Sequence, residues 1–154
     1  MNKHPLLLAA LCAAFAQPAA HAQSAAPAAS AAAPADDTLF RALGGQAGIA
    51  RIVDDFVPRL VADPRLSEFF RKARREHLEQ MLAQQFCQVS GGGCAYTGLP
   101  MKLAHQDMDI SKGDFNALVE VLQASMDAQG VPFATQNQLL ARLAPMHREI
   151  VNVH

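Results

Sequence analysis

The sequence predicts an all-α domain of roughly 115–120 residues, preceded by two segments that do not contribute to the fold. Apolar residues recur at three- and four-residue spacing in four stretches, and no stretch alternates with period two for long enough to predict a strand. Gly, Pro and Asp residues separate these stretches. The chain has 154 residues, of which 51% are hydrophobic, so its length fits a single domain.

The first 22 residues have the features of a secretory signal. Lys3 lies near the start, an apolar stretch covers residues 5–16, and Ala20-His21-Ala22 supplies a cleavage pattern of small residues. The apolar stretch is too short for a transmembrane helix, which needs about 20 residues. We therefore expect cleavage near Ala22, export to the periplasm, and no stable membrane anchor afterwards.

Residues 23–35 contain only Ala, Pro, Ser and one Gln, and they predict a disordered linker because they offer nothing large to bury. The folded domain is then predicted over residues 36–154. The whole chain carries 13 Lys and Arg against 14 Asp and Glu, a nearly neutral balance that gives no reason to expect nucleic acid as a partner.

The first predicted helix follows Gly44-Gly45 and ends at Asp63-Pro64. Its apolar residues form a single stripe on one side: Ile49, Ile52, Val53, Phe56 and Leu60. Pro58 lies inside the stripe, so a kink is expected there. A short segment at residues 66–70 follows.

A second helix is predicted from residue 74 to about residue 89, with Leu78, Leu82 and Phe86 at helical spacing. Three consecutive glycines, residues 91–93, end it. A loop then leads into a short segment at residues 100–106.

The third predicted helix begins with a capping box, in which Ser111 precedes Asp114 by three residues. Its apolar face consists of Phe115, Leu118, Val119, Leu122 and Met126, and Gly130 closes it. The last helix opens at Pro132 and extends to Ile150, with a kink expected at Pro145. Periodicity alone also fits a plain four-helix bundle.

The order and separation of several short strings favour a particular architecture. These strings are Leu43-Gly44-Gly45, Val53-Asp54-Asp55-Phe56, Phe69-Phe70, Gly91-Gly92, Tyr96-Thr97-Gly98 and Met101-Lys102-x-x-His105. Over residues 38–151 the chain resembles the group I truncated haemoglobins. The resemblance implies a two-over-two helical sandwich that encloses one haem b, with the glycine pairs in tight turns at helix ends.

His105 is the predicted proximal ligand of the haem iron. An imidazole on an apolar wall is the usual proximal ligand of such iron, and neutral His is the commonest metal ligand in proteins. His105 follows Met101 by four residues and coincides with the position that binds iron in the family. Because the motif C-x-x-C-H is absent, we expect the haem to be held without covalent attachment.

The resemblance also assigns the residues that surround the haem. It implies that Phe70 stacks at the haem edge. The basic run at residues 71–75 is typical of a solvated face, but its cations and Lys102, near His105, are also candidate partners of the propionates. The remaining lining residues are Leu78, Leu82, Phe86, Met101, Ile110, Phe115, Leu118 and Met146. Each of them is equally compatible with ordinary core packing.

The distal side departs from the family pattern, in which a Tyr often follows the Asp-Phe pair. Val57 occupies that place here, and the only Tyr of the chain is Tyr96. Oxygen bound without a donor loses a hydrogen bond worth roughly 1.5–3 kcal/mol, so it should dissociate about one to two orders of magnitude faster. Candidate compensating donors, if the helix is rotated or shifted, are His77, Gln80, Gln84 and Gln85.

His77 has a second interpretation, as a sixth ligand of the iron, with Met81 as another candidate. Six-coordinate iron would favour electron transfer or redox sensing. The alternative is an exposed His77 after a basic run, and His147 and His154 are also expected on the surface.

Cys87 and Cys94 remain after signal cleavage and flank the glycine turn. In an exported protein such a pair is a candidate for a disulfide between the second helix and its loop. Geometry decides whether the bond forms.

The sequence thus predicts an exported haem protein that binds diatomic ligands reversibly: oxygen, and also NO or CO. Alternatives are NO oxidation, peroxidase-like turnover, a six-coordinate electron-transfer protein and a helical binding module without haem. A reductase is the expected protein partner.

Overall fold

The computed structural model of the protein describes residues 36–153, and within them every regular element is helical. The predicted signal and linker lie outside the described residues. The elements are α1 (Thr38–Ala42), α2 (Gly45–Ala62), α3 (Ser67–Phe70), α4 (Arg75–Val89), α5 (Met101–Ala104), α6 (Lys112–Ala128), α7 (Phe133–Leu143), the 3-10 helix η1 (Ala144–Met146) and α8 (His147–Ile150). None of the helices described here has both the length and the apolar character needed to cross a bilayer.

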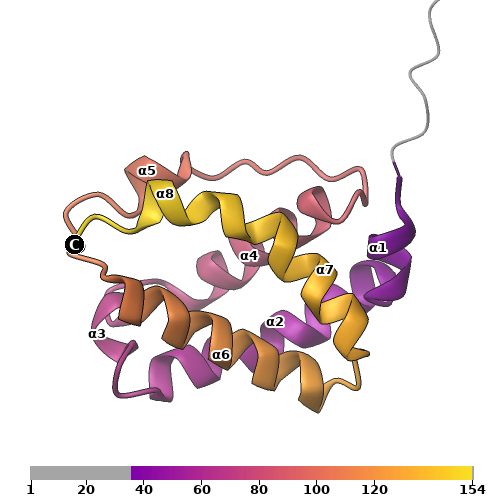
Figure 1. Ribbon diagram of the computed structural model, residues 1–154, viewed down its shortest axis with the longest axis horizontal. Helices are drawn as coiled ribbons and strands as arrows, with labels where there is room; N and C mark the ends of the chain where they lie inside the picture. The colour runs from indigo at the N-terminus through magenta and orange to yellow at the C-terminus, as the bar shows by residue number, and fades with distance from the viewer. Residues whose placement is uncertain (1–35, 154) are drawn as a thin grey trace, which may run out of the picture. The chain divides into compact units, whose positions relative to one another are not determined.

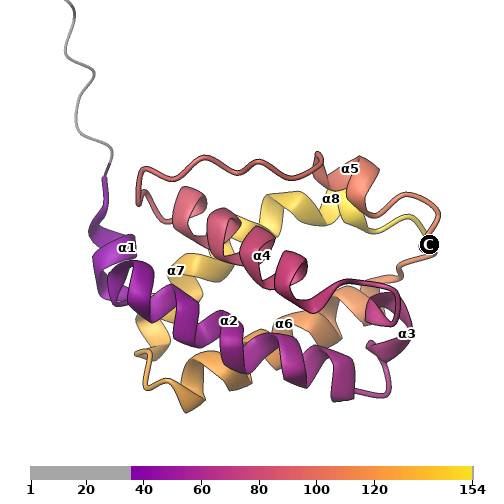
Figure 2. The same cartoon turned by 180° about the vertical axis from the view of Figure 1, so that it is seen from behind.

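The helices form two layers. Figures 1 and 2 show α6 and α7 with α8 on one side and α2 with α4 on the other, and α5 lies beside α8 at one end. Helix α2 packs against both α4 and α6, so it joins the two layers. This arrangement is the two-over-two sandwich that the sequence predicted.

The core is built around the apolar stripe of α2. Five residues of this stripe are at most 1% exposed: Ile49, Ile52, Val53, Phe56 and Leu60. Val57 is buried with them, as are Phe86 and Cys87 from α4 and Leu122 and Met126 from α6. Burial of such side chains contributes about 1.5–3 kcal/mol each relative to exposure, so the stripe contributes substantially to stability.

Helix α2 continues past Pro58 to Ala62. Proline lacks the N–H that would bond to the carbonyl of Asp54 four residues earlier. Both Asp54 and Pro58 are exposed, so water can satisfy that carbonyl. The proline therefore leaves the buried stripe intact.

The predicted glycine turns lie before α2 and after α4, and both are next to α1. Gly44 and Gly45 have φ values of 87° and 64°, and Gly91 has a φ of 88°. These angles are in the left-handed region, which glycine adopts without steric cost. The backbone can therefore reverse sharply from α1 into α2 and leave α4 abruptly.

Two elements differ from the sequence expectation, and a third agrees with it. Helix α1 was not predicted, because five residues are too few to display a helical period. Helix α5 is a single turn, shorter than the predicted segment at residues 100–106. At Pro145 the last helix is interrupted by η1, which confirms the expected kink.

The capping box of α6 is complete. The Ser111 backbone N–H and hydroxyl donate to Asp114 Oδ2 at 2.9 and 2.7 Å, and the Asp114 backbone N–H donates to Ser111 Oγ at 3.3 Å. Bonds from the Ser111 side chain, and then from its backbone, lower the pKa of Asp114 below its usual value. The charged carboxylate therefore stabilises the start of α6.

Cys87 and Cys94 form a disulfide, with their Cα atoms 5.7 Å apart. Cys87 is fully buried on α4, and Cys94 lies in the loop that leads to α5. Gly92 packs so closely that a Cβ atom there would overlap the Phe40 ring and the Cys87 sulfur. The bond therefore ties the loop to the end of α4 and against α1.

We predict that Cys94→Ser lowers the free energy of unfolding by about 2–3 kcal/mol, because the disulfide closes a short loop in the unfolded chain. Guanidinium denaturation under oxidising conditions measures the change. A reductant should destabilise the wild type by a similar amount and leave the variant unaffected. Equal stability of the two oxidised proteins would contradict the prediction.

We predict that Asp114→Asn removes a charged capping interaction worth about 1 kcal/mol at neutral pH. Because the folded pKa of Asp114 is lowered, its contribution is present above the unfolded value and is lost as the pH falls. Thermal unfolding from pH 7 to pH 3 should therefore show the two proteins converging at low pH. A difference that grows on acidification would disprove this account.

Candidate functional site

Helix α4 has two inward faces with different environments. Phe86 and Cys87 face the core, where the Phe86 ring lies 6.4 Å from that of Phe56 between centroids. Leu78, Leu82 and Gln85 recur at four and three residues on another face and are half-buried. The second face therefore leaves large side chains incompletely covered by protein.

The opposite wall consists of α5, the start of α6, and η1 with α8. Its side chains are also half-buried: Met101, His105, Phe115, Leu118, Met146 and His147. The Phe115 and His147 rings meet edge to face at 4.8 Å between centroids. Predominantly apolar side chains from both layers thus surround one region without being fully enclosed.

The His105 ring is oriented by its own helix turn. Its Nδ1 lies 2.8 Å from the carbonyl oxygen of Met101. A carbonyl can only accept, so Nδ1 must carry a proton, and in the neutral imidazole Nε2 then keeps a free lone pair. No described residue hydrogen-bonds Nε2, which is the arrangement that a metal-binding imidazole requires.

Gln85 is the polar group on the half-buried face of α4. Its Nε2 lies 3.2 Å from the Met101 sulfur and 3.4 Å from the Met146 sulfur. Thioether sulfur is a weak acceptor, so this amide keeps donor capacity for a better partner. Gln85 therefore connects α4 to both α5 and η1 in the region described above.

The other candidate donors on α4 are directed elsewhere. Gln84 Oε1 accepts from the backbone N–H of Thr97 at 3.0 Å and from its hydroxyl at 2.9 Å. His77 and Gln80 are exposed. The structure therefore gives no support to His77 as a sixth ligand; Met81 is half-buried on the same helix.

Tyr96 is held in the loop between α4 and α5. Its hydroxyl donates to the Leu99 carbonyl at 3.2 Å, and burial raises the pKa of the phenol. The only Tyr of the chain thus lies in a loop, and its hydroxyl fastens that loop.

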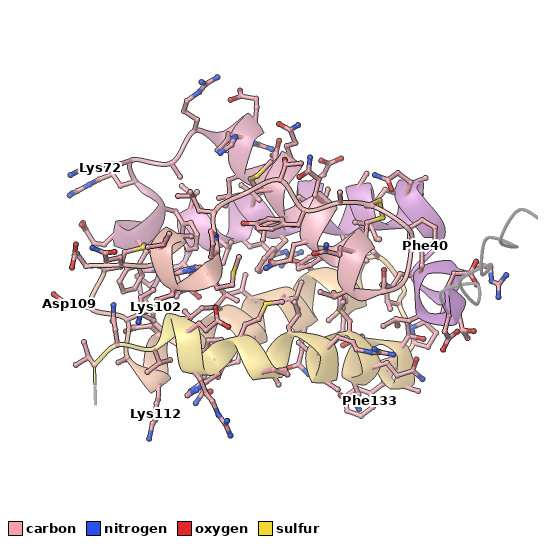
Figure 3. The ribbon with its side chains drawn as sticks, turned by 90° about the horizontal axis from the view of Figure 1, so that it is seen from above. Phe40, Lys72, Lys102, Asp109, Lys112 and Phe133 are labelled. Atoms are coloured by element: carbon pink, nitrogen blue, oxygen red, sulfur yellow. A yellow bond between two sulfur atoms is a disulfide. The ribbon has the colours of Figure 1, made fainter. Side chains whose placement is uncertain are left out.

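A cleft of about 530 Å³ adjoins His105 between α5 and α8. Its lining residues are Lys102, His105, Gln106, Asp107, Arg148, Glu149, Val151 and Asn152. Figure 3 shows Lys102 and Asp109 at the same end of the domain as Lys72. Lys102 and Arg148 place two cations at this opening, beside the carboxylates of Asp107 and Glu149.

The remaining predicted residues are distributed around the region. Phe70 is half-buried on α3, and Ile110 is 7% exposed just before α6. Phe86 belongs to the core on the α2 side. His147, expected on the surface, is instead half-buried, because its ring packs on Phe115.

Three residues that sequence reasoning did not assign belong to this region: Arg148, His147 and Asn152. The sequence gives Gln85 only as one of several candidate hydrogen-bond donors on this helix. Its spacing from Leu78 and Leu82 would have distinguished it from Gln84, because residues three and four apart share a helix face. The place of Asn152 has no local signal, since its partners are more than 40 residues away.

The donor set fits a haem. Among the described residues no group of three or more His, Cys, Asp or Glu side chains could hold a metal ion. A single imidazole with a free Nε2, facing apolar and partly covered side chains, is instead what a haem iron needs from a protein. The two cations beside it suit the carboxylates of a haem edge.

Comparison with known proteins agrees with this fit. The sequence profile of the bacterial-like globins matches residues 38–152. The group 1 truncated haemoglobin GlbN of Mycolicibacterium paratuberculosis is 33% identical over 113 residues, which cover 73% of this chain and 83% of that protein. A group 1 truncated haemoglobin of Tetrahymena thermophila is 32% identical over 94 residues, covering 61% and 78%.

Solved structures share the fold. The truncated haemoglobin of Tetrahymena pyriformis in its Fe(III) form has a TM-score of 0.72 at 24% identity, covering 74% of this chain and 97% of that one. The 2/2 haemoglobin of Synechococcus sp. PCC 7002, in the cyanomet state with covalently attached haem, has a TM-score of 0.69 at 22% identity and covers 74% and 98%. Membership in this family supports haem-based ligand binding. The family profile, the fold and these relatives together show that the chain belongs to the bacterial-like globin family as a group 1 truncated haemoglobin.

Proposed function

We propose that this protein holds one haem b without a covalent bond and binds diatomic ligands reversibly, with oxygen as the principal ligand and NO or CO as others. The observation that carries the proposal is the His105 ring, whose Nδ1 is fixed by the Met101 carbonyl at 2.8 Å while Nε2 stays free. When bound, haem would supply the iron that takes up the diatomic ligand.

The chain's own residues would orient the cofactor from both faces. His105 lies on one wall, and the half-buried face of α4 with Leu78 and Leu82 lies on the other. Phe70 and Phe115 offer aromatic surface at the edges, and aromatic side chains bury much area at low entropic cost. Apolar walls of this kind exclude water from the ligand position.

Lys102 and Arg148 are the proposed partners of the haem propionates. Both line the cleft beside His105. Lys102 was a candidate from the sequence, whereas Arg148 is added by the fold. Exposed ion pairs of this kind contribute little, about 0–1 kcal/mol each, so they would orient the haem more than retain it.

On the ligand side Gln85 is the proposed donor. Val57 is buried in the core and offers no hydrogen bond, and Gln84 is engaged by Thr97. The Gln85 amide meets only two thioether sulfurs, so it can turn toward a partly negative ligand. The chain thus offers a single neutral donor and no distal tyrosine. This supports weaker retention of oxygen than in relatives that have the tyrosine.

The proposal also includes export of the protein to the periplasm and a reductase as the partner that reduces its iron. The Cys87–Cys94 disulfide supports an oxidising compartment, since disulfides persist there and are rare in the cytosol. Because both cysteines are in the disulfide, neither has a free thiol to form a bond with haem. This supports a haem that is held by His105 and by packing alone.

We predict that His105→Gly abolishes axial ligation, because no second described imidazole is oriented in the same way. Absorption spectra of the ferrous protein should lose the five-coordinate His signature, and added imidazole should restore it. His77→Ala, at an exposed position on α4, is the matched control and should leave the spectrum unchanged. An unaltered spectrum and haem affinity in His105→Gly would refute the assignment.

We predict that Gln85→Leu accelerates oxygen dissociation about tenfold, the equivalent of one hydrogen bond of about 1.4 kcal/mol. Stopped-flow or flash photolysis measures the rate, and Gln80→Leu at an exposed position of the same helix is the control. Val57→Tyr tests the converse and should slow dissociation by one to two orders of magnitude, about 1.5–3 kcal/mol. Unchanged rates in Gln85→Leu would remove Gln85 from the ligand side.

A further inference from the structure

The element that carries His105 cannot fix its position alone. Helix α5 has only four residues, and His105 is its C-cap. A single turn is unstable in isolation, because fixing its backbone costs more than one or two hydrogen bonds return. The carbonyls of its last turn also have no partner within the helix.

The segment after His105 is strained as well. Between His105 and Ile110, Asp107 and Asp109 have φ values of 59° and 53°. These are left-handed angles that a residue with a Cβ adopts at a cost. Such a conformation persists only where surrounding structure imposes it.

Asn152, in the segment that follows α8, makes contacts to both ends of this loop. Its side-chain Oδ1 accepts from the Ile110 backbone N–H at 2.6 Å, and its Nδ2 donates to the His105 carbonyl at 3.2 Å. The backbone N–H groups of Asn152 and Val153 donate to the Ile110 carbonyl at 3.0 and 3.1 Å. One amide side chain thus bridges the two ends of the strained loop and supplies a partner for an orphan carbonyl.

We propose that Asn152 is a positioning residue for the iron ligand: it sets the place of the His105 backbone, while the Met101 carbonyl sets the rotation of the ring. This inference rests on the proposed function and deepens it. Displacing the strap formed by residues 151–153 would let the loop relax and move Nε2 away from its position. The position of the iron ligand is therefore controlled by the segment that follows α8.

Two variants separate the two side-chain contacts of Asn152. Asn152→Ala removes both. Asn152→Asp keeps an oxygen for the Ile110 N–H but places a carboxylate oxygen against the His105 carbonyl, which removes the donor and adds repulsion. Asn137→Ala, at an exposed asparagine of α7, is the matched control.

The first measurement needs no haem. Hydrogen exchange of the Ile110 amide in the apoprotein should be accelerated about three- to tenfold in Asn152→Ala, the equivalent of one lost hydrogen bond. Asn152→Asp and Asn137→Ala should retain the wild-type exchange rate. Equal protection in Asn152→Ala would show that the side chain does not hold the loop and would overturn the proposal.

The second measurement uses the haem-loaded protein. The iron–histidine stretching band of the ferrous form should shift or broaden in both Asn152 variants, and haem transfer to excess apomyoglobin should be about three- to tenfold faster. A lowered melting temperature with an unchanged band would indicate a merely structural role and overturn the proposal. A normal band and transfer rate in Asn152→Asp would equally overturn the contact to the His105 carbonyl.

The wild type separates this inference from the proposed function. Should the wild-type protein fail to take up haem, or show no iron–histidine band, the proposed function is wrong. Should the wild type show the band and both Asn152 variants match it, only the positioning role is wrong.

Discussion

Burial of the apolar stripe of α2 against two helices at once is the constraint on which the rest of the fold depends. Ile49, Ile52 and Phe56 are at most 1% exposed, and α2 contacts both α4 and α6. Because α2 covers one face of α4, the face with Leu82 and Gln85 is directed toward the other layer of helices. The region assigned to the haem thus results from helix packing and needs no special element.

The stabilising core and the candidate site lie in different parts of the domain. The α2 core, the disulfide and the capping box of α6 hold the frame through extensive burial and short-range contacts. The His105 side is held by few interactions: one carbonyl at the ring, and the Asn152 strap at the backbone. Segments with little buried surface open at low free energy, which suits a wall that must admit a cofactor.

Much of the helical layout could be predicted from residues alone. Apolar spacing predicted α2, α4, α6 and α7, and the Ser111–Asp114 pair marked the start of α6, because these signals act within one or two turns. Helix α1 is not predictable in this way, because its five residues are too few to display a helical period of apolar residues. His147 was expected on the surface, since nothing local reveals that its ring packs on Phe115.

Some features of the candidate site are likewise predictable from the sequence, and others depend on the tertiary structure. The sequence by itself determined the fold family and pointed to His105, since ordered motifs and helical periods are properties of the chain. Only the tertiary structure decided which of the distal polar residues faces inward: Gln84 bonds to a loop, and Gln85 reaches α5 and η1. It also brought Arg148 and Asn152 to the His105 side. Such choices depend on contacts between residues far apart in the chain, and local spacing carries no information about them.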